Sequence, residues 1–335
     1  MTRDKILFMV GKIKRFLHTC GEWVKHLFSS WPKVFIGISV AAIIGLYPLS
    51  AIINEEIDRT ADYDFSDVSE SQSQGLQAAV FLIDREINKH LWTANLPFFF
   101  PAYVLDNMPA FQTGIIKALA PVIKTWGEQV QCPDDEKKQK YLSKAGELLG
   151  YPVDVWLLDN TNKLKIAPSS AAQYRKARKK IKDFNQALHE EKCFWVRDGK
   201  TLSALNETII VGLEKVAKYV ENEIREGSTG WFETQSDDVF YHNQGRVYAY
   251  MIMMKKLGRD YKQLLMSDGI YQEWTTAIRA LQTATEINPI MVLNGDIKAG
   301  IKANHLVALG YYVLKAQNML VKINQKLNGD TRNDN

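Results

Sequence analysis

The residues best suited to chemistry lie in one short stretch that carries two aspartates and a histidine. Asp237 and Asp238 precede His242 in the run Asp-Asp-Val-Phe-Tyr-His. On a helix, residues four apart share a face, so the carboxylate of Asp238 would reach the imidazole of His242. A carboxylate that holds an imidazole in one tautomer turns it into a general base. The sequence therefore offers these three residues as catalytic candidates.

The same aspartates also suit a structural role. They follow Ser236, where the pattern predicts the start of a helix over residues 236–257. Acidic side chains in a first helical turn bind exposed backbone N–H groups and complement the positive end of the helix dipole. We expect capping to be the main role of Asp237 and Asp238, with a catalytic or metal-binding role as the alternative.

Other signatures of an enzyme are absent from the sequence. Its six histidines include no HExxH pair, and there is no G-x-S-x-G motif and no glycine-rich phosphate loop. These patterns would place a metal, a nucleophile or a nucleotide phosphate at a helix or strand end. We therefore expect no metal site and no cofactor.

Three cysteines occur, Cys20, Cys132 and Cys193, and none of them forms a CxxC pair. If Cys132 and Cys193 share an oxidising compartment, they are the natural pair for a disulfide. That bond would close a loop of 61 residues. In the chain-entropy model it would add about 4 kcal/mol to the free energy of unfolding. Two unpaired, buried thiols are the alternative.

A membrane span is the strongest topological signal in the chain. Residues 34–53 read VFIGISVAAIIGLYPLSAII, twenty residues without a charge. At about 1.5 Å per residue they form a helix of roughly 30 Å, which matches the hydrocarbon core of a bilayer. Because 33 residues precede the run, we interpret it as a retained signal anchor and not as a cleaved signal peptide.

Charge sets the expected orientation of that span. Residues 1–33 carry seven basic and two acidic side chains, a net charge of +5, whereas the remainder of the chain sums to −1. Positive flanks stay in the cytoplasm, so the tail is expected inside and residues 54–335 outside the membrane. The tail is a basic amphipathic helix suited to an anionic bilayer surface, or alternatively to a partner helix. This distribution does not favour a nucleic acid as partner.

Helical periodicity dominates the remainder. We predict an all-α fold, in which one N-terminal transmembrane helix is followed by a helical-bundle ectodomain of about seven helices. Residues 260–286 are predicted as one of these helices, and residues 153–166 as a short hairpin. The expected parts are a cytoplasmic basic amphipathic tail at 1–33, the transmembrane helix at 34–53, a linker at 54–72, a helical periplasmic domain at 73–328 and a disordered tail at 329–335.

An aromatic run stands between two prolines. Phe98, Phe99 and Phe100 lie between Pro97 and Pro101, which forbid a regular helix there. Three adjacent aromatic rings cannot all enter one small core. They are therefore candidates for a docking patch or a membrane contact, with full burial as the alternative.

Five motifs occur in order along the chain: Leu96-Pro97-Phe98-Phe99-Phe100-Pro101, Leu105-Asp106-Asn107-Met108-Pro109, Pro168-Ser169-Ser170 with Tyr174-Arg175, Asp237-Asp238-Val239-Phe240-Tyr241 and Ala303-Asn304-His305. Together they resemble the domain of unknown function 2333 family of bacterial membrane proteins. The resemblance implies a bacterial inner-membrane protein and carries over no activity. It singles out Asp106, Asn107 and His305 as further candidate binding positions.

Two functions remain open on the sequence alone. The first is a non-enzymatic binding or scaffolding protein of the envelope, with the lipid bilayer and an envelope protein as partners. The second is an envelope hydrolase that acts on cell wall or lipid through Asp237, Asp238 and His242. The hydrolase requires one polar pocket that joins these residues to Asp106 or His305.

Overall fold

The structure is a computed structural model. It describes residues 57–65, 68–96, 107–133, 136–156, 158–159, 165–226, 234–289 and 305–330, and the single residues 19, 34, 37 and 39. The chain divides into two compact units, Met1–Ile53 and Asn54–Asn335. The predicted tail at 1–33 and the predicted span at 34–53 fall almost entirely outside the described residues. Within the described ranges, no helix combines the length and the apolarity that a membrane crossing needs.

The second unit is mostly helical, which confirms the predicted all-α class. Its helices are α2 (Gln74–Asp84), the π-helix η1 (Arg85–Lys89), α3 (Asn107–Glu128), α4 (Glu136–Gln139), α5 (Tyr141–Leu149), α6 (Ser170–His189), α7 (Gly199–Glu226), α8 (Thr234–Asp260), α9 (Lys262–Ser267), α10 (Tyr271–Glu286) and α11 (His305–Asp330). Two short antiparallel pairs join β1 (Val130–Gln131) to β4 (Phe194–Trp195), and β2 (Leu158–Asp159) to β3 (Lys165–Ile166). The second pair is the predicted hairpin.

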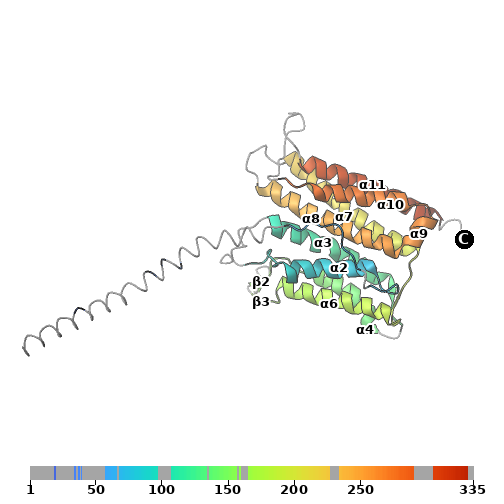
Figure 1. Cartoon of the computed structure of the whole chain (residues 1–335), viewed down its shortest axis with the longest axis horizontal. Coiled ribbons are helices and arrows are strands. Elements are labelled where there is room, and N and C mark those ends of the chain that lie inside the picture. The colour runs from blue at the N-terminus through green and yellow to red at the C-terminus, as the bar shows by residue number, and fades with distance from the viewer. Residues whose placement is uncertain are drawn as a thin grey trace, which may run out of the picture. The chain divides into compact units, whose positions relative to one another are not determined.

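The long helices lie side by side (Figure 1). Helices α10 and α11 form one edge, α7 and α8 follow, α3 and α2 come next, and α6 lies at the other edge. Apolar side chains from all of these helices form one continuous core. Helix α8 is central, because it packs against α2, α3, α7 and α10.

Local sequence explains where several helices begin and end. Ser169 caps α6 by accepting a hydrogen bond from the Ala172 amide at 3.3 Å. The single helix predicted over 260–286 is wrong. The chain turns at Tyr261 and again at Gly269, which has a φ of +62° that glycine adopts without a steric cost. Helices α8, α9 and α10 are therefore separate.

Two glycines allow α3 and α8 to touch backbone to backbone. A Cβ atom on Gly114 of α3 would lie 2.0 Å from the carbonyl oxygen of His242. A Cβ atom on Gly245 of α8 would lie 2.1 Å from the carbonyl oxygen of Phe111. Both distances are far inside van der Waals contact, so no larger residue fits at either position while the helices stay in place.

The N-terminus of α2 is bound by the last residue of α8. The carboxylate of Asp260 accepts hydrogen bonds from the Ser73 hydroxyl at 2.7 Å and from the amides of Gln74 and Gly75 at 2.8 and 2.9 Å. An anion at this position complements the positive end of the α2 dipole. Asp260 thereby fixes α2 to α8.

Residues 57–65, predicted as part of a linker, pack against the domain as an extended segment that we call the strap. The Tyr248 hydroxyl donates to the Thr60 carbonyl at 2.7 Å, and the Lys256 ammonium donates to the carbonyl of Tyr63. The rings of Tyr63 and Phe65 pack against the core. The polar composition that predicts a linker thus belongs to a segment whose hydrogen-bond partners are more than 180 residues away.

A buried charge cluster reinforces the strap. Arg85 and Glu86, only 3% and 1% exposed, form an ion pair in the π-helix η1. The Arg85 guanidinium also donates to the hydroxyls of Tyr248 at 2.6 Å and Tyr63 at 3.1 Å, and lies 3.4 Å from the carboxylate of Asp58. Because an unpaired buried charge is costly, these groups hold strap, η1 and α8 together.

The contact between α3 and α8 can be tested with one added methyl group. We expect Gly245→Ala to lower the free energy of unfolding by about 1–3 kcal/mol or more, since the helices must separate to admit the Cβ atom. Gly329→Ala is the matched control, because a Cβ atom there meets no atom within 4 Å. Chemical denaturation measures both; equal stability of the two variants would contradict the close contact.

Candidate functional site: a groove over helix α8

Two neighbouring cavities follow one face of α8, and together we call them the α8 groove. Asp238 and His242 line the first cavity, of about 580 Å³. Arg246 and Tyr250 line the second, of about 250 Å³. These four residues are spaced by four along α8 and therefore lie on one face of the helix.

Helices α3 and α7 form the walls of the groove. Pro109, Ala110 and Thr113 of α3 face the first cavity, opposite Tyr219 of α7. Farther along, the wall residues of the second cavity are Lys117 and Pro121 of α3 and Glu207, Thr208, Val211, Gly212 and Lys215 of α7. The ring of Tyr219 is 52% exposed and lies 5.8 Å from the Arg246 guanidinium, so an aromatic face and a cation are available at the rim.

His242 is held by hydrogen bonds from two different elements. Its Nε2 atom accepts a hydrogen bond from Nε of Arg246 at 3.2 Å. The ring is also hydrogen-bonded to the backbone of Ala110 in α3. Because an arginine Nε always donates, Nε2 must carry a lone pair, and the proton of the neutral ring is then on Nδ1.

The electrostatics of His242 favour the uncharged ring. Burial, together with the nearby cations Arg246 and Lys117, lowers its pKa to about 4, although the hydrogen bond to Ala110 opposes them. A carboxylate that oriented the imidazole for base catalysis would raise the pKa instead. His242 is therefore a neutral group that joins two helices, with both ring nitrogens engaged.

The structure brings only part of the predicted site together. Asp238 is exposed and shares the first cavity with His242, as the helical spacing predicts. Helix α8 begins at Thr234 and not after Ser236, and Asp237 is an acidic residue of its first turn. Capping and dipole effects remain the expected role of these aspartates.

The other candidate residues lie elsewhere. Asn107 and His305 are the first residues of α3 and α11, and neither lines the α8 groove. Burial lowers the pKa of His305. Asp106 and the three phenylalanines Phe98, Phe99 and Phe100 fall outside the described residues. The pocket that the hydrolase hypothesis requires, joining His242 to His305, is therefore not formed by the groove.

Cys132 and Cys193 form a disulfide remote in the chain from the groove residues of α8. Their Cα atoms are 4.2 Å apart, and both side chains are buried. The bond lies beside the β1–β4 pair, where the ring of Trp195 packs between Trp126 and Tyr261 at 4.9 and 5.3 Å. It closes the 61-residue loop that contains α4, α5 and α6.

Sequence reasoning missed the cations of the groove. Lys117, Lys215 and Arg246 come from three helices, and no motif links them. One signal was present, because continuing the four-residue spacing from Asp238 and His242 leads directly to Arg246 and Tyr250. Among the residues that the structure describes, no group of three or more His, Cys, Asp or Glu side chains is placed to hold a metal ion.

The depressed pKa of His242 predicts a specific loss of stability in acid. An unfolded histidine titrates near pH ~6.5, so below that pH the unfolded chain binds the proton before the folded chain does. Stability is then lost as the pH falls from about 6.5 to 4. Between pH 7 and pH 5 we expect the wild type to lose about 2 kcal/mol more than His242→Gln does.

Denaturant titrations at the two pH values measure this difference. His189→Gln, at the exposed end of α6, is the control and should keep the pH dependence of the wild type. If His242→Gln and the wild type respond alike to acid, the imidazole is not held in its neutral form.

One family model matches the chain, that of "Uncharacterized protein conserved in bacteria (DUF2333)", over residues 201–329. The match spans α7 to α11 and includes the floor and one wall of the groove. No curated protein and no solved structure matches the chain. Over residues 201–329 the chain is therefore similar to the domain of unknown function 2333 family, the family that its motifs resemble.

Proposed function

We propose that this chain is a membrane-anchored protein of the bacterial envelope that binds a partner in the α8 groove and catalyses no reaction there. The environment of His242 carries this proposal. A neutral imidazole bound on both nitrogens, beside two cations, is suited to recognition and poorly suited to general base catalysis. An aromatic ring, two lysines and an arginine along one groove are typical of a surface that binds another macromolecule.

The proposed location of the chain in the bacterial envelope is supported mainly by the sequence. The uncharged run at 34–53 supports a single membrane span, and the basic tail before it supports a cytoplasmic N-terminus. The domain from residue 54 onward would then lie in the periplasm. The disulfide supports this side of the membrane, because such bonds persist in oxidising compartments. Its partners would be the lipid bilayer and a second envelope protein.

A hydrolase is the second candidate, because Asp238 and His242 do line one cavity. To act as a base, His242 would have to release the Arg246 guanidinium and pair with a carboxylate. The groove would then open onto a cell-wall or lipid substrate.

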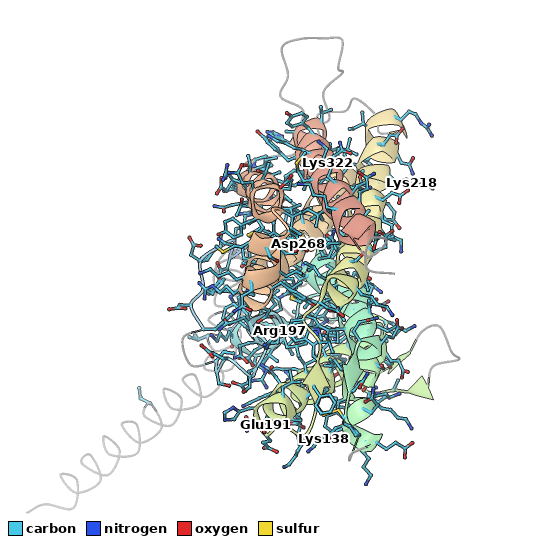
Figure 2. The ribbon with its side chains drawn as sticks, turned by 90° about the vertical axis from the view of Figure 1, so that its right-hand side faces the viewer. Lys138, Glu191, Arg197, Lys218, Asp268 and Lys322 are labelled. Atoms are coloured by element: carbon cyan, nitrogen blue, oxygen red, sulfur yellow. A yellow bond between two sulfur atoms is a disulfide. The ribbon has the colours of Figure 1, made fainter. Side chains whose placement is uncertain are left out.

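Site-specific photo-crosslinking in living cells tests the binding function. A photoreactive amino acid at Thr113 or Tyr219, on opposite walls, should give one discrete adduct with an envelope protein. Lys322 is the control position, on the exposed face of α11 in Figure 2, and should not give that adduct. We expect Arg246→Ala to reduce the adduct severalfold, since it removes the cation on the groove floor.

Two results would overturn the proposal. One is the same adduct from the groove and from Lys322. The other is release of product from purified cell wall or lipid by the full chain, with the release lost in both Asp238→Asn and His242→Gln; that result would establish the hydrolase.

Thiol labelling tests the orientation separately. We expect a membrane-impermeant maleimide to label Lys322→Cys in intact spheroplasts, because that side chain is exposed on α11. Cys20, in the predicted cytoplasmic tail, should be labelled only after the membrane is lysed. Labelling of Cys20 in intact spheroplasts would contradict the predicted orientation.

A further inference from the structure

A third cavity, separate from the two that form the α8 groove, lies between the strap, the end of α8, α9 and α10. It has a volume of about 600 Å³, within the range of pockets that hold small ligands. Its lining carries five cations, Lys255, Lys256, Arg259, Lys262 and Arg279. Only two carboxylates, Asp62 and Asp64 of the strap, accompany them. We call this the cationic cavity, and its lining shares no residue with the groove.

The two strap carboxylates hold their cations loosely. Asp62 lies 2.7 Å from the ammonium of Lys255, and Asp64 lies 3.5 Å from the guanidinium of Arg259. The aspartate side chains are 89% and 75% exposed. Exposed ion pairs of this kind contribute little to stability, because water screens them. A stronger anion can therefore displace them without unfolding the domain.

Two of the remaining cations, Lys262 and Arg279, lack even this compensation. In the described part of the chain, no ion pair engages Lys262 or Arg279, and both side chains are exposed at the cavity. Lys256 is 4% exposed, and its ammonium lies 4.6 Å from the centre of the Phe65 ring. Burial lowers the pKa of Lys256 and the neighbouring cation Arg259 lowers it further, although Asp64 and Asp62 oppose them. Positive potential is therefore concentrated in this cavity.

The opposite wall is partly apolar. Tyr271, Trp274 and Ile278 of α10 line it, and the ring of Tyr271 is 41% exposed. A bare inorganic anion would leave this wall in contact with water. An anion that is attached to a ring or to a chain would cover it and gain apolar contact.

We infer that the cationic cavity binds the phosphate group of an envelope ligand, in place of the strap carboxylates Asp62 and Asp64. A phosphate carries up to two negative charges and accepts several hydrogen bonds. It therefore matches the two arginine forks and three ammonium groups better than a single carboxylate does. The ligand is either a phosphorylated sugar or the headgroup of an anionic lipid, and the phosphate is common to both.

Binding to the full chain in phosphatidylcholine nanodiscs tests the inference and separates the two sources. Glucose 6-phosphate, followed by calorimetry, is the probe for a soluble sugar phosphate. Vesicles of phosphatidylglycerol mixed with phosphatidylcholine, followed by co-flotation, are the probe for a lipid headgroup. The basic tail at 1–33 is present in every variant, so a difference between variants reports on the cavity.

Two sets of variants should respond in opposite directions. We expect Lys262→Glu with Arg279→Glu to weaken binding of the preferred probe about tenfold or more, because charge-assisted hydrogen bonds are lost. Asp62→Asn with Asp64→Asn should tighten binding about two- to fivefold, because the competing carboxylates are removed while the strap keeps its backbone contacts.

A matched control separates this site from general charge attraction. Lys315→Glu with Lys322→Glu changes the net charge equally, on exposed positions of α11, and should leave binding unchanged. The inference is overturned if the control weakens binding as much as Lys262→Glu with Arg279→Glu, if the asparagine variants fail to tighten it, or if neither probe binds the wild type. Circular dichroism verifies that each variant keeps its helices. None of these outcomes depends on the α8 groove.

Discussion

The backbone contact between α3 and α8 is the constraint on which the rest of the structure depends. At Gly114 and Gly245 the two helices approach until a Cβ atom would overlap a carbonyl oxygen of the other helix. That approach brings Ala110 of α3 within hydrogen-bonding reach of His242 and brings Lys117 close enough to shift its pKa. The neutral state of the His242 imidazole therefore depends on Gly114 and Gly245, two residues that have no side chain. The chemistry that the α8 groove can offer depends on that neutral state.

Helix α8 contributes to two separate surfaces of the domain at different points along its length. One face supplies His242, Arg246 and Tyr250 to the groove. Its C-terminal turns supply Lys255, Lys256 and Arg259 to the cationic cavity, and its last residue, Asp260, holds the start of α2. A single helix packed on several sides can serve two separate surfaces because each surface uses a different stretch of it.

The sequence predicts the helices better than it predicts which side chains of different helices pack against one another. Helical periodicity predicts the all-α class, although the single helix predicted over 260–286 is divided into α9 and α10. The four-residue spacing of Asp238 and His242 places them on one face, as the structure has it. Spacing along one helix does not reveal what packs against it, so it does not predict the Arg246 and Lys117 charges that keep His242 neutral.

The positions of the cysteines in the sequence give no Cα distance, so the sequence alone leaves the bond between Cys132 and Cys193 as one of two alternatives. The polar composition of the strap predicts a linker, because its partners on α8 are more than 180 residues away in the sequence.

The strap also defines where the autonomous unit begins. A fragment that started at residue 73 would retain every helix from α2 onward, yet it would lose the residues that cover Tyr248, Lys256 and the ring of Phe81. The buried guanidinium of Arg85 would lose two of its partners, the hydroxyl of Tyr63 and the carboxylate of Asp58. A protease that cut between residues 65 and 73 would therefore leave a nicked chain. The strap would stay bound to the helices through its noncovalent contacts. The boundary for producing or dissecting this domain lies before residue 57, well upstream of its first helix.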